Sequence, residues 1–160
     1  MGKIPDSIVT KGGLNTESFY DFIISRYIAP YFTIILNKIK KLTPNQVTLI
    51  SFLTLIIAGI LTLNVKYLGN IVYRTTIALL IQLAFILDCC DGQLARLSGR
   101  TSKVGGWLDK LLDRVGEFYI FTVFGIVAWI RTGNVLFFIF GVITGYSLCL
   151  LYTSDAADEL

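Results

Sequence analysis

The sequence predicts an all-α fold, a multi-pass bundle of transmembrane helices. Hydrophobic residues make up 54% of the 160-residue chain, and its mean hydropathy is +0.70. Only 16% of the residues are charged, against about 25% in an ordinary soluble domain. Several apolar runs are long enough to cross ~30 Å of hydrocarbon. We therefore expect an integral membrane protein, and the modest net charge of +3 does not indicate a nucleic-acid partner.

The N-terminal part predicts a helix that lies along the membrane surface. Residues 1–13 lack the charged-then-apolar plan of a cleavable signal peptide. Residues 14–42 carry apolar and polar side chains at helical spacing, which favours an interfacial amphipathic helix with a kink at Pro30. A short transmembrane span is the alternative. The apolar face consists of Phe19, Phe22, Ile23, Tyr27, Tyr31, Ile34, Ile35 and Ile39.

Four membrane spans are expected in the remainder of the chain. Thr43-Pro44-Asn45 supplies a capping residue and a first-turn proline, so a helix is expected to begin there. The predicted spans are residues 46–64, 71–90, 105–130 and 134–150. Residues 66–70 and the polar stretch 97–104 form short connections between them.

The distribution of basic residues predicts the orientation of these spans. With the N-terminus inside, 11 of the 14 Lys and Arg residues lie on the inner side, and only Lys66, Arg74 and Arg131 lie outside. Cytoplasmic segments carry such an excess. We therefore expect the segment between the second and third spans to face the cytosol, at the cytoplasmic membrane if the source is prokaryotic.

The last 12 residues, CLLYTSDAADEL, change abruptly to an acidic composition. Residues 149–159 match the translation of a common transposon-type sequencing adapter. We therefore expect a transmembrane domain over residues 1–148, incomplete at its C-terminus, followed by a non-native tail over residues 149–160. A genuine acidic C-terminus is the alternative.

Four aspartates lie at the ends of the second and third spans. Asp88 and Asp91 are three residues apart, and Asp109 and Asp113 are four apart, so each pair shares a helix face. The two spans form an antiparallel hairpin, which brings both pairs to the same membrane depth. Carboxylates gathered there would repel one another and need cations. Oxygen ligands alone favour Mg²⁺ or Mn²⁺, with Ca²⁺ as an alternative, and two ions suit four acids.

Neighbouring residues fit a phosphate ligand, which paired divalent ions commonly clamp. Arg96 follows Gly92 by one turn and can make a forked contact with phosphate. Ser102 stands near the start of the third span, where free N–H groups favour anions. Singly, each feature has an ordinary explanation, as a surface ion pair, a turn or a packing position. The chain has no histidine, so acid–base chemistry must use other groups.

The spacing of these residues resembles the signature of the CDP-alcohol phosphotransferase family. Eight fixed residues over 26 positions match it: Asp88-x2-Asp91-Gly92-x2-Ala95-Arg96-x8-Gly105-x3-Asp109-x3-Asp113. The stretch from Pro44 to Thr48 also resembles the PNxxT start of the family's first span. Members usually have six spans, so a chain with four agrees with truncation.

The resemblance implies an enzyme of phospholipid biosynthesis. Such an enzyme moves a substituted phosphate group from a CDP-alcohol, often CDP-diacylglycerol, to a small polar alcohol and releases CMP. By the family pattern, Asp88, Asp91, Asp109 and Asp113 hold two Mg²⁺ or Mn²⁺ ions. Asp113 also acts as the general base. The implied CDP contacts are Asn45, Thr48, Gly92, Arg96 and Ser102.

Other interpretations stay open at this point. A cation-coupled transporter or a non-catalytic scaffold would also place acids in a membrane, although none of these lies in the middle of a span. Lys103 and Lys110 are candidate contacts for a phosphorylated acceptor, or simply part of the basic inner surface. The Gly141-x3-Gly145 pattern packs helices, either within the chain or in a homodimer.

Overall fold

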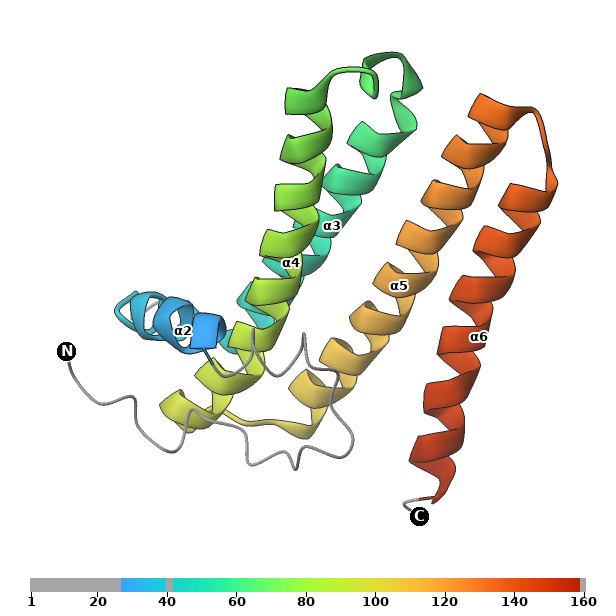
Figure 1. The fold of residues 1–160 in the computed structure, drawn as a ribbon. Helices are drawn as coiled ribbons and strands as arrows, with labels where there is room; N and C mark the ends of the chain where they lie inside the picture. The colour runs from blue at the N-terminus through green and yellow to red at the C-terminus, as the bar shows by residue number, and fades with distance from the viewer. Residues whose placement is uncertain (1–26, 40–41, 159–160) are drawn as a thin grey trace. The chain divides into compact units, whose positions relative to one another are not determined.

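The described part of the chain is helical throughout. A computed structural model describes residues 27–39 and 42–158, and it contains no strand in those ranges (Figure 1). The all-α class is therefore confirmed. The elements are α2 (Ala29–Asn37), α3 (Pro44–Leu63), the 3-10 helix η2 (Val65–Tyr67), α4 (Ile71–Ser98), α5 (Lys103–Thr132) and α6 (Leu136–Asp158).

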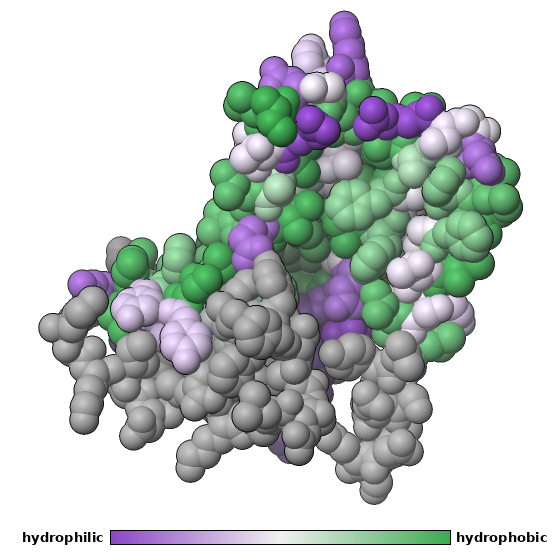
Figure 2. Space-filling view, in the orientation of Figure 1, coloured by the Kyte–Doolittle hydropathy of each residue, from purple (hydrophilic) through white to green (hydrophobic). Residues whose placement is uncertain are grey.

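Two of these helices are long and apolar enough to cross a membrane. They are α3 and α4, and α6 carries a shorter apolar stretch, Leu136–Leu150. Hydrophobic residues cover most of the visible described surface (Figure 2). On α3, for example, Leu53, Ile57 and Ile60 are each about half exposed, as side chains in contact with lipid would be. The four-span arrangement stays a prediction.

Helix α4 continues beyond the predicted span 71–90 and ends at Ser98, and it includes Gly92 and Arg96, which were expected one turn apart on a helix. The added turns bury Gln93 and Leu94, which are 1% and 2% exposed. Gly99 then ends the helix with a positive φ of 65°. The Arg100 N–H donates to the Ala95 carbonyl at 3.1 Å, and the Gly99 N–H donates to that of Arg96 at 3.4 Å. This pattern is a Schellman C-cap.

The described residues fall into two compact units, and the first contains the aspartates of α4. It comprises the residues up to Ser51 together with Gln82–Asp109. Its core is built by Ala29 of α2 against Ile86 and Cys90 of α4. The Thr33 hydroxyl donates to Gln93 Oε1 at 3.0 Å, and the Cys90 thiol donates to the Ala29 carbonyl at 3.4 Å. These contacts fix α2 to the polar end of α4.

The predicted amphipathic helix is only partly within the described residues, because positions 14–26 lie outside them. In α2, Ala29 and Thr33 are buried, while Tyr31 and Ile35, like Tyr27 just before the helix, are each more than half exposed. Pro30, the expected kink, lies in the first turn of α2. Proline is tolerated there, because an N–H at that position has no partner within the helix.

The second unit comprises Phe52–Ile81 and Lys110–Leu160. Leu68, Ile77 and Val127 form its buried core. Helices α5 and α6 meet through glycines: a Cβ on Gly141 would lie 2.9 Å from Gly125 Cα, and one on Gly145 would lie 3.0 Å from Phe118 Cα. The small-residue pattern of α6 therefore packs against α5 within the chain.

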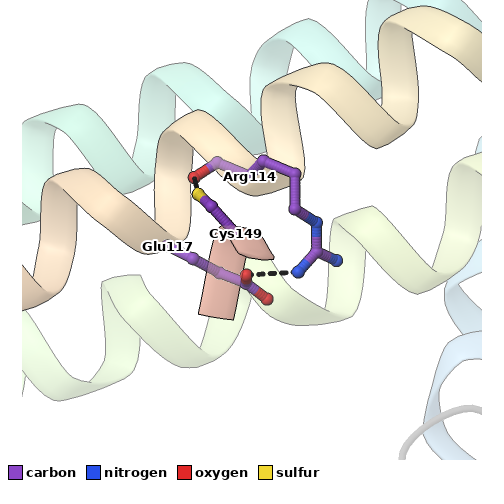
Figure 3. Close-up of polar contacts among 3 residues, drawn as sticks. All are labelled: Arg114, Glu117 and Cys149. Atoms are coloured by element: carbon purple, nitrogen blue, oxygen red, sulfur yellow. Dashed lines mark hydrogen bonds and ion pairs between the residues drawn. The ribbon is translucent and has the colours of Figure 1, made fainter. Parts of the chain in front are cut away.

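The end of α6 also contacts α5 in this unit. Cys149 Sγ lies 3.7 Å from the Arg114 carbonyl, and the Arg114 side chain pairs with Glu117 at 2.5 Å (Figure 3). The helix continues without a break from Leu136 to Asp158, across the expected junction at residue 148. The non-native tail stays a prediction.

Candidate active site

Three aspartates from two helices come together in the first unit. Asp88 and Asp91 lie three residues apart on one face of α4, and Asp109 comes from the second turn of α5. One ligand oxygen from each can be chosen so that all three lie within 4.8 Å of one another. Asp91 is only 4% exposed, and the other two are half-buried. The juxtaposition expected for these three residues is present.

Such an arrangement requires positive charge. Two unit negative charges ~5 Å apart repel by about 3 kcal/mol at an effective dielectric constant of ~20. Three ionised carboxylates contain three such pairs, so a bound cation would stabilise them strongly. All ligand atoms are carboxylate oxygens, which suit hard divalent ions such as Mg²⁺ and Mn²⁺. The residues present therefore fit a divalent metal ion.

The fourth predicted ligand, Asp113, is not part of this group of three. It lies one turn beyond Asp109 on α5 and is half-buried. Residues four apart on a helix share a face, so Asp113 projects from the same side of α5 as Asp109. Its roles as metal ligand and base stay predictions.

Thr48 contacts one of the three aspartates directly. Its hydroxyl donates a short hydrogen bond to Asp91 Oδ2, joining the first turns of α3 to α4. Both residues are nearly buried, at 5% and 4% exposure. Sequence analysis assigned Thr48 to a nucleotide pocket, but it did not predict this bond to a carboxylate.

A cavity of about 200 Å³ lies beside Asp91 and Asp109. All five residues that the sequence assigned to the CDP contacts line this cavity, and their roles stay predictions. The lining also includes the ends of the connection between α4 and α5. Its residues are Pro44, Asn45, Thr48, Asp91, Gly92, Ala95, Arg96, Arg100, Thr101, Ser102, Gly105, Gly106 and Asp109.

One wall of the cavity is the first turn of α5. Ser102 caps this helix, since its Oγ accepts the Gly105 N–H at 2.9 Å. That bond uses a lone pair and leaves the Ser102 O–H able to donate to a ligand. A Cβ on Gly105 would lie 2.8 Å from Asn45 Oδ1 and 2.9 Å from Ser102 Oγ. Glycine at this position therefore lets α3 approach the start of α5.

The cavity lining also includes basic side chains that suit an anion. Arg96 was expected there, but Arg100 and Thr101 were missed. They lie after the end of α4, so helical periodicity gives no information about their direction. The capping turn at Gly99 reverses the chain and leaves Arg100 at the cavity. A glycine between two arginines and just before a serine cap is the signal that could have predicted this turn.

Lys103 and Lys110 have a different setting. Both are exposed on α5, and neither is among the residues that line the cavity. Lys103 is the first residue of α5, next to the Ser102 cap. Their assignment to an acceptor stays a prediction.

Comparisons with known proteins point to one family. Residues 41–157 match the family described as CDP-alcohol phosphatidyltransferase. A bifunctional IPC transferase and DIPP synthase of Thermococcus kodakarensis is 46% identical over 76 residues, which is 48% of this chain and 16% of that protein. An archaetidylinositol phosphate synthase of Pyrococcus horikoshii is 35% identical over 91 residues, 55% of this chain and 45% of that protein.

A third relative covers more of the sequence. A phosphatidylinositol phosphate synthase of Streptomyces avermitilis is 30% identical over 133 residues, which is 79% of this chain and 51% of that protein. The chain therefore spans at most about half the length of these relatives. The matched family region includes α3, α4 and α5, and with them every residue of the cavity.

Proposed function

The chain belongs to the CDP-alcohol phosphatidyltransferase family, and we propose that it catalyses transfer of a phosphatidyl-type group. The donor is a CDP-linked lipid such as CDP-diacylglycerol, and the acceptor is the hydroxyl of a small polar alcohol. The acceptor oxygen forms a bond to the phosphorus that carries the lipid. The bond between the two phosphate groups breaks, and CMP leaves.

One observation carries this proposal: three aspartates within 4.8 Å of one another lie beside a cavity that is lined by Arg96, Arg100 and a helix N-terminus. Acidic residues alone would indicate only a cation site. Basic side chains and free N–H groups alone would indicate only an anion site. Side by side, they suit a ligand that brings its own negative charge to a metal, as a nucleoside diphosphate does.

We assign Asp88, Asp91, Asp109 and Asp113 to two Mg²⁺ or Mn²⁺ ions. When bound, such ions neutralise a diphosphate and polarise the phosphorus that is attacked. Arg96 and Arg100 bind the phosphate oxygens, and Ser102 donates its O–H at the start of α5. Gly92 leaves the α4 backbone open, because a Cβ there would meet only Arg96 Nη1, at 3.6 Å. Asn45 and Thr48 close the nucleotide side of the cavity.

The acceptor must lose a proton as it reacts. A hydroxyl is a poor nucleophile at neutral pH, so a positioned base has to take its proton. We assign this step to Asp113, one turn from Asp109 on the same face of α5. The carboxylate accepts the hydroxyl proton while the acceptor oxygen attacks. Arg96 and Arg100 stabilise the charge that develops on the departing CMP phosphate.

For the acceptor we propose an inositol phosphate. The names of two relatives, an archaetidylinositol phosphate synthase and a phosphatidylinositol phosphate synthase, support this choice. Lys103 and Lys110 are exposed cations on α5, the helix that carries Asp113. They attract the acceptor phosphate as it approaches.

The membrane arrangement that we propose has four spans in this chain, with the aspartates at the cytosolic face. The excess of basic residues on one side supports this orientation. Residues 14–42, which include α2, lie along the interface, with Tyr27, Tyr31 and Ile35 directed to the lipid. A homodimer is part of the proposal, although Gly141 and Gly145 already pack against α5.

The test is an acceptor screen with CMP release as the readout. Membranes with a labelled CDP-lipid receive inositol phosphate, glycerol 3-phosphate or serine. Because the relatives are longer, the screen uses this chain and the protein from the uninterrupted reading frame of its gene. We expect CMP and a new phosphodiester with inositol phosphate. The proposal fails if neither protein releases CMP with any acceptor, and another preferred acceptor would overturn only the acceptor assignment.

A further inference from the structure

We propose that Thr48 is a positioning residue for the metal site, and that its hydroxyl orients the Asp91 carboxylate for a divalent ion. This inference rests on the proposed metal site and gives Thr48 a role distinct from contact with the nucleotide. The observation that carries it is the hydrogen bond from Thr48 Oγ1 to Asp91 Oδ2 between two buried side chains.

The Thr48 hydroxyl has two acceptors and only one proton. Oγ1 lies 3.2 Å from the Pro44 carbonyl, the ordinary bond of a helical threonine to the residue four positions earlier. The second acceptor is the Asp91 carboxylate. Hydrogen bonds to ionised acceptors are shorter and about twice as strong as neutral ones. The proton therefore goes to Asp91, and α3 is tied to α4 at the metal site.

This bond has a geometric consequence for Asp91. With Oδ2 held by Thr48, the carboxylate cannot rotate freely, and Oδ1 is left for a cation shared with Asp88 and Asp109. Burial of both residues, at 5% and 4% exposure, keeps water from competing for the bond. Groups that orient a metal ligand typically change metal affinity 10–100-fold when they are mutated.

Thr62 provides a matched control in the same helix. Its hydroxyl donates to the Ala58 carbonyl at 2.8 Å, and it is also 5% exposed. It thus shares residue type, helix, burial and backbone bond with Thr48. It differs in that it belongs to the second unit and donates to no aspartate. A comparison of variants at Thr48 and Thr62 therefore separates the effect of losing any buried threonine hydroxyl from the effect of losing the hydrogen bond to Asp91.

The test measures Mn²⁺ binding rather than turnover. The purified full chain is titrated with Mn²⁺ without nucleotide, and the free aqueous ion is quantified by electron paramagnetic resonance. We expect Thr48→Val to weaken the apparent Mn²⁺ affinity by tenfold or more. Thr48→Ser should restore affinity to within about twofold of wild type, because it keeps the hydroxyl. Thr62→Val should bind as wild type does.

The outcomes separate this inference from the function it rests on. Wild-type affinity in Thr48→Val, with Mn²⁺ binding lost in Asp91→Asn, overturns the positioning role and leaves the metal site intact. Equal binding by wild type and Asp91→Asn overturns both. If Thr48→Val does not elute as a folded protein, Thr48→Ala is compared with Thr62→Ala, and the same tenfold difference decides.

Discussion

The two units of the chain use threonine differently. In the first unit, Thr33 and Thr48 also lie near the carbonyl four residues earlier, but each hydroxyl has a second acceptor on α4, Gln93 and Asp91 respectively, and can connect separate helices. In the second unit, Thr62, Thr76, Thr122 and Thr132 each donate to a carbonyl four residues earlier in their own helix. Polar bonds between side chains of different helices are thus found where the aspartates gather, and they hold these side chains in place.

The second unit is held together differently. Its helices approach through glycine, as at Gly125 and Gly141, and through tyrosine hydroxyls that bond to backbone carbonyls. Tyr119 donates to Ile56 at 3.0 Å, and Tyr73 donates to Leu61 at 2.8 Å. Such contacts need a small residue and a neighbouring backbone, and they carry no charge. The comparison therefore predicts that substitutions around the aspartates, including Asp113 at the start of the second unit's part of α5, change chemistry. Substitutions at the glycine contacts of the second unit are expected to change stability.

Metal removal should have the largest effect. We expect excess chelator to abolish CMP release and added Mg²⁺ or Mn²⁺ to restore it, because the Asp88, Asp91 and Asp109 carboxylates repel one another and the donor diphosphate when no cation is present. Circular dichroism should show unchanged helix content, since the glycine and tyrosine contacts between helices of the second unit involve no metal ligand. Turnover that persists in excess chelator would remove the metal from the mechanism.

The next largest effect is expected from Asp113→Asn. Loss of a general base typically costs 10²–10⁴-fold in rate, so CMP release should fall by about that factor while membrane insertion stays normal. Glu117→Gln is the matched control: Glu117 lies one turn further along α5, is also partly exposed and pairs with Arg114. Its turnover should stay within about threefold of wild type. Undiminished CMP release by Asp113→Asn would contradict the base assignment.

A smaller effect is expected at the cavity wall. A Cβ on Gly105 would meet Asn45 and Ser102 below 3.0 Å, whereas one on Gly106 would meet nothing within 4 Å. Gly105→Ala should therefore raise the KM for the CDP donor by about tenfold, since the start of α5 must shift. Gly106→Ala should leave the KM unchanged and gain a little helix stability. Equal KM values in the two variants would show that close approach at Gly105 is unimportant for donor binding.

The smallest effect on activity is expected at the glycine contacts between α5 and α6. A Cβ on Gly141 would lie 2.6 Å from the Phe121 carbonyl oxygen and 2.9 Å from Gly125 Cα. Overpacking of this kind costs about 1–3 kcal/mol, so Gly141→Ala should lower the Tm in detergent and leave Mn²⁺ affinity unchanged. A fall in Mn²⁺ affinity without a fall in Tm would remove the distinction between the two units.

The sequence was a good guide where local patterns decide the structure. Hydropathy predicted the helical class, and the spacing of Asp88, Asp91 and Asp109 predicted that α4 and α5 would bring them together. The residues proposed for the nucleotide, from Asn45 to Ser102, also line one cavity. Asn45 and Thr48 were assigned through the family resemblance rather than through helical spacing, and the roles of all these residues stay predictions.

The features that the sequence did not predict depend on contacts between segments that are distant along the chain. The bond from Thr48 to Asp91 joins residues 43 positions apart, and no periodicity within either helix predicts it. Arg100 lines the cavity because a Schellman turn at Gly99 redirects the chain, so its position depends on where α4 ends. The polar connection was expected from residue 97, and α4 ends at Ser98, with Gln93 and Leu94 buried near its end.

The most direct test of the account is the position of the metal itself. Crystals grown with Mn²⁺ and CDP, measured at the manganese absorption edge, would show the ion as an anomalous difference peak. We predict at least one peak within coordination distance of the Asp88, Asp91 and Asp109 carboxylates, beside density for the diphosphate. Well-ordered carboxylates with no anomalous peak between them, or manganese bound only elsewhere, would contradict the central claim.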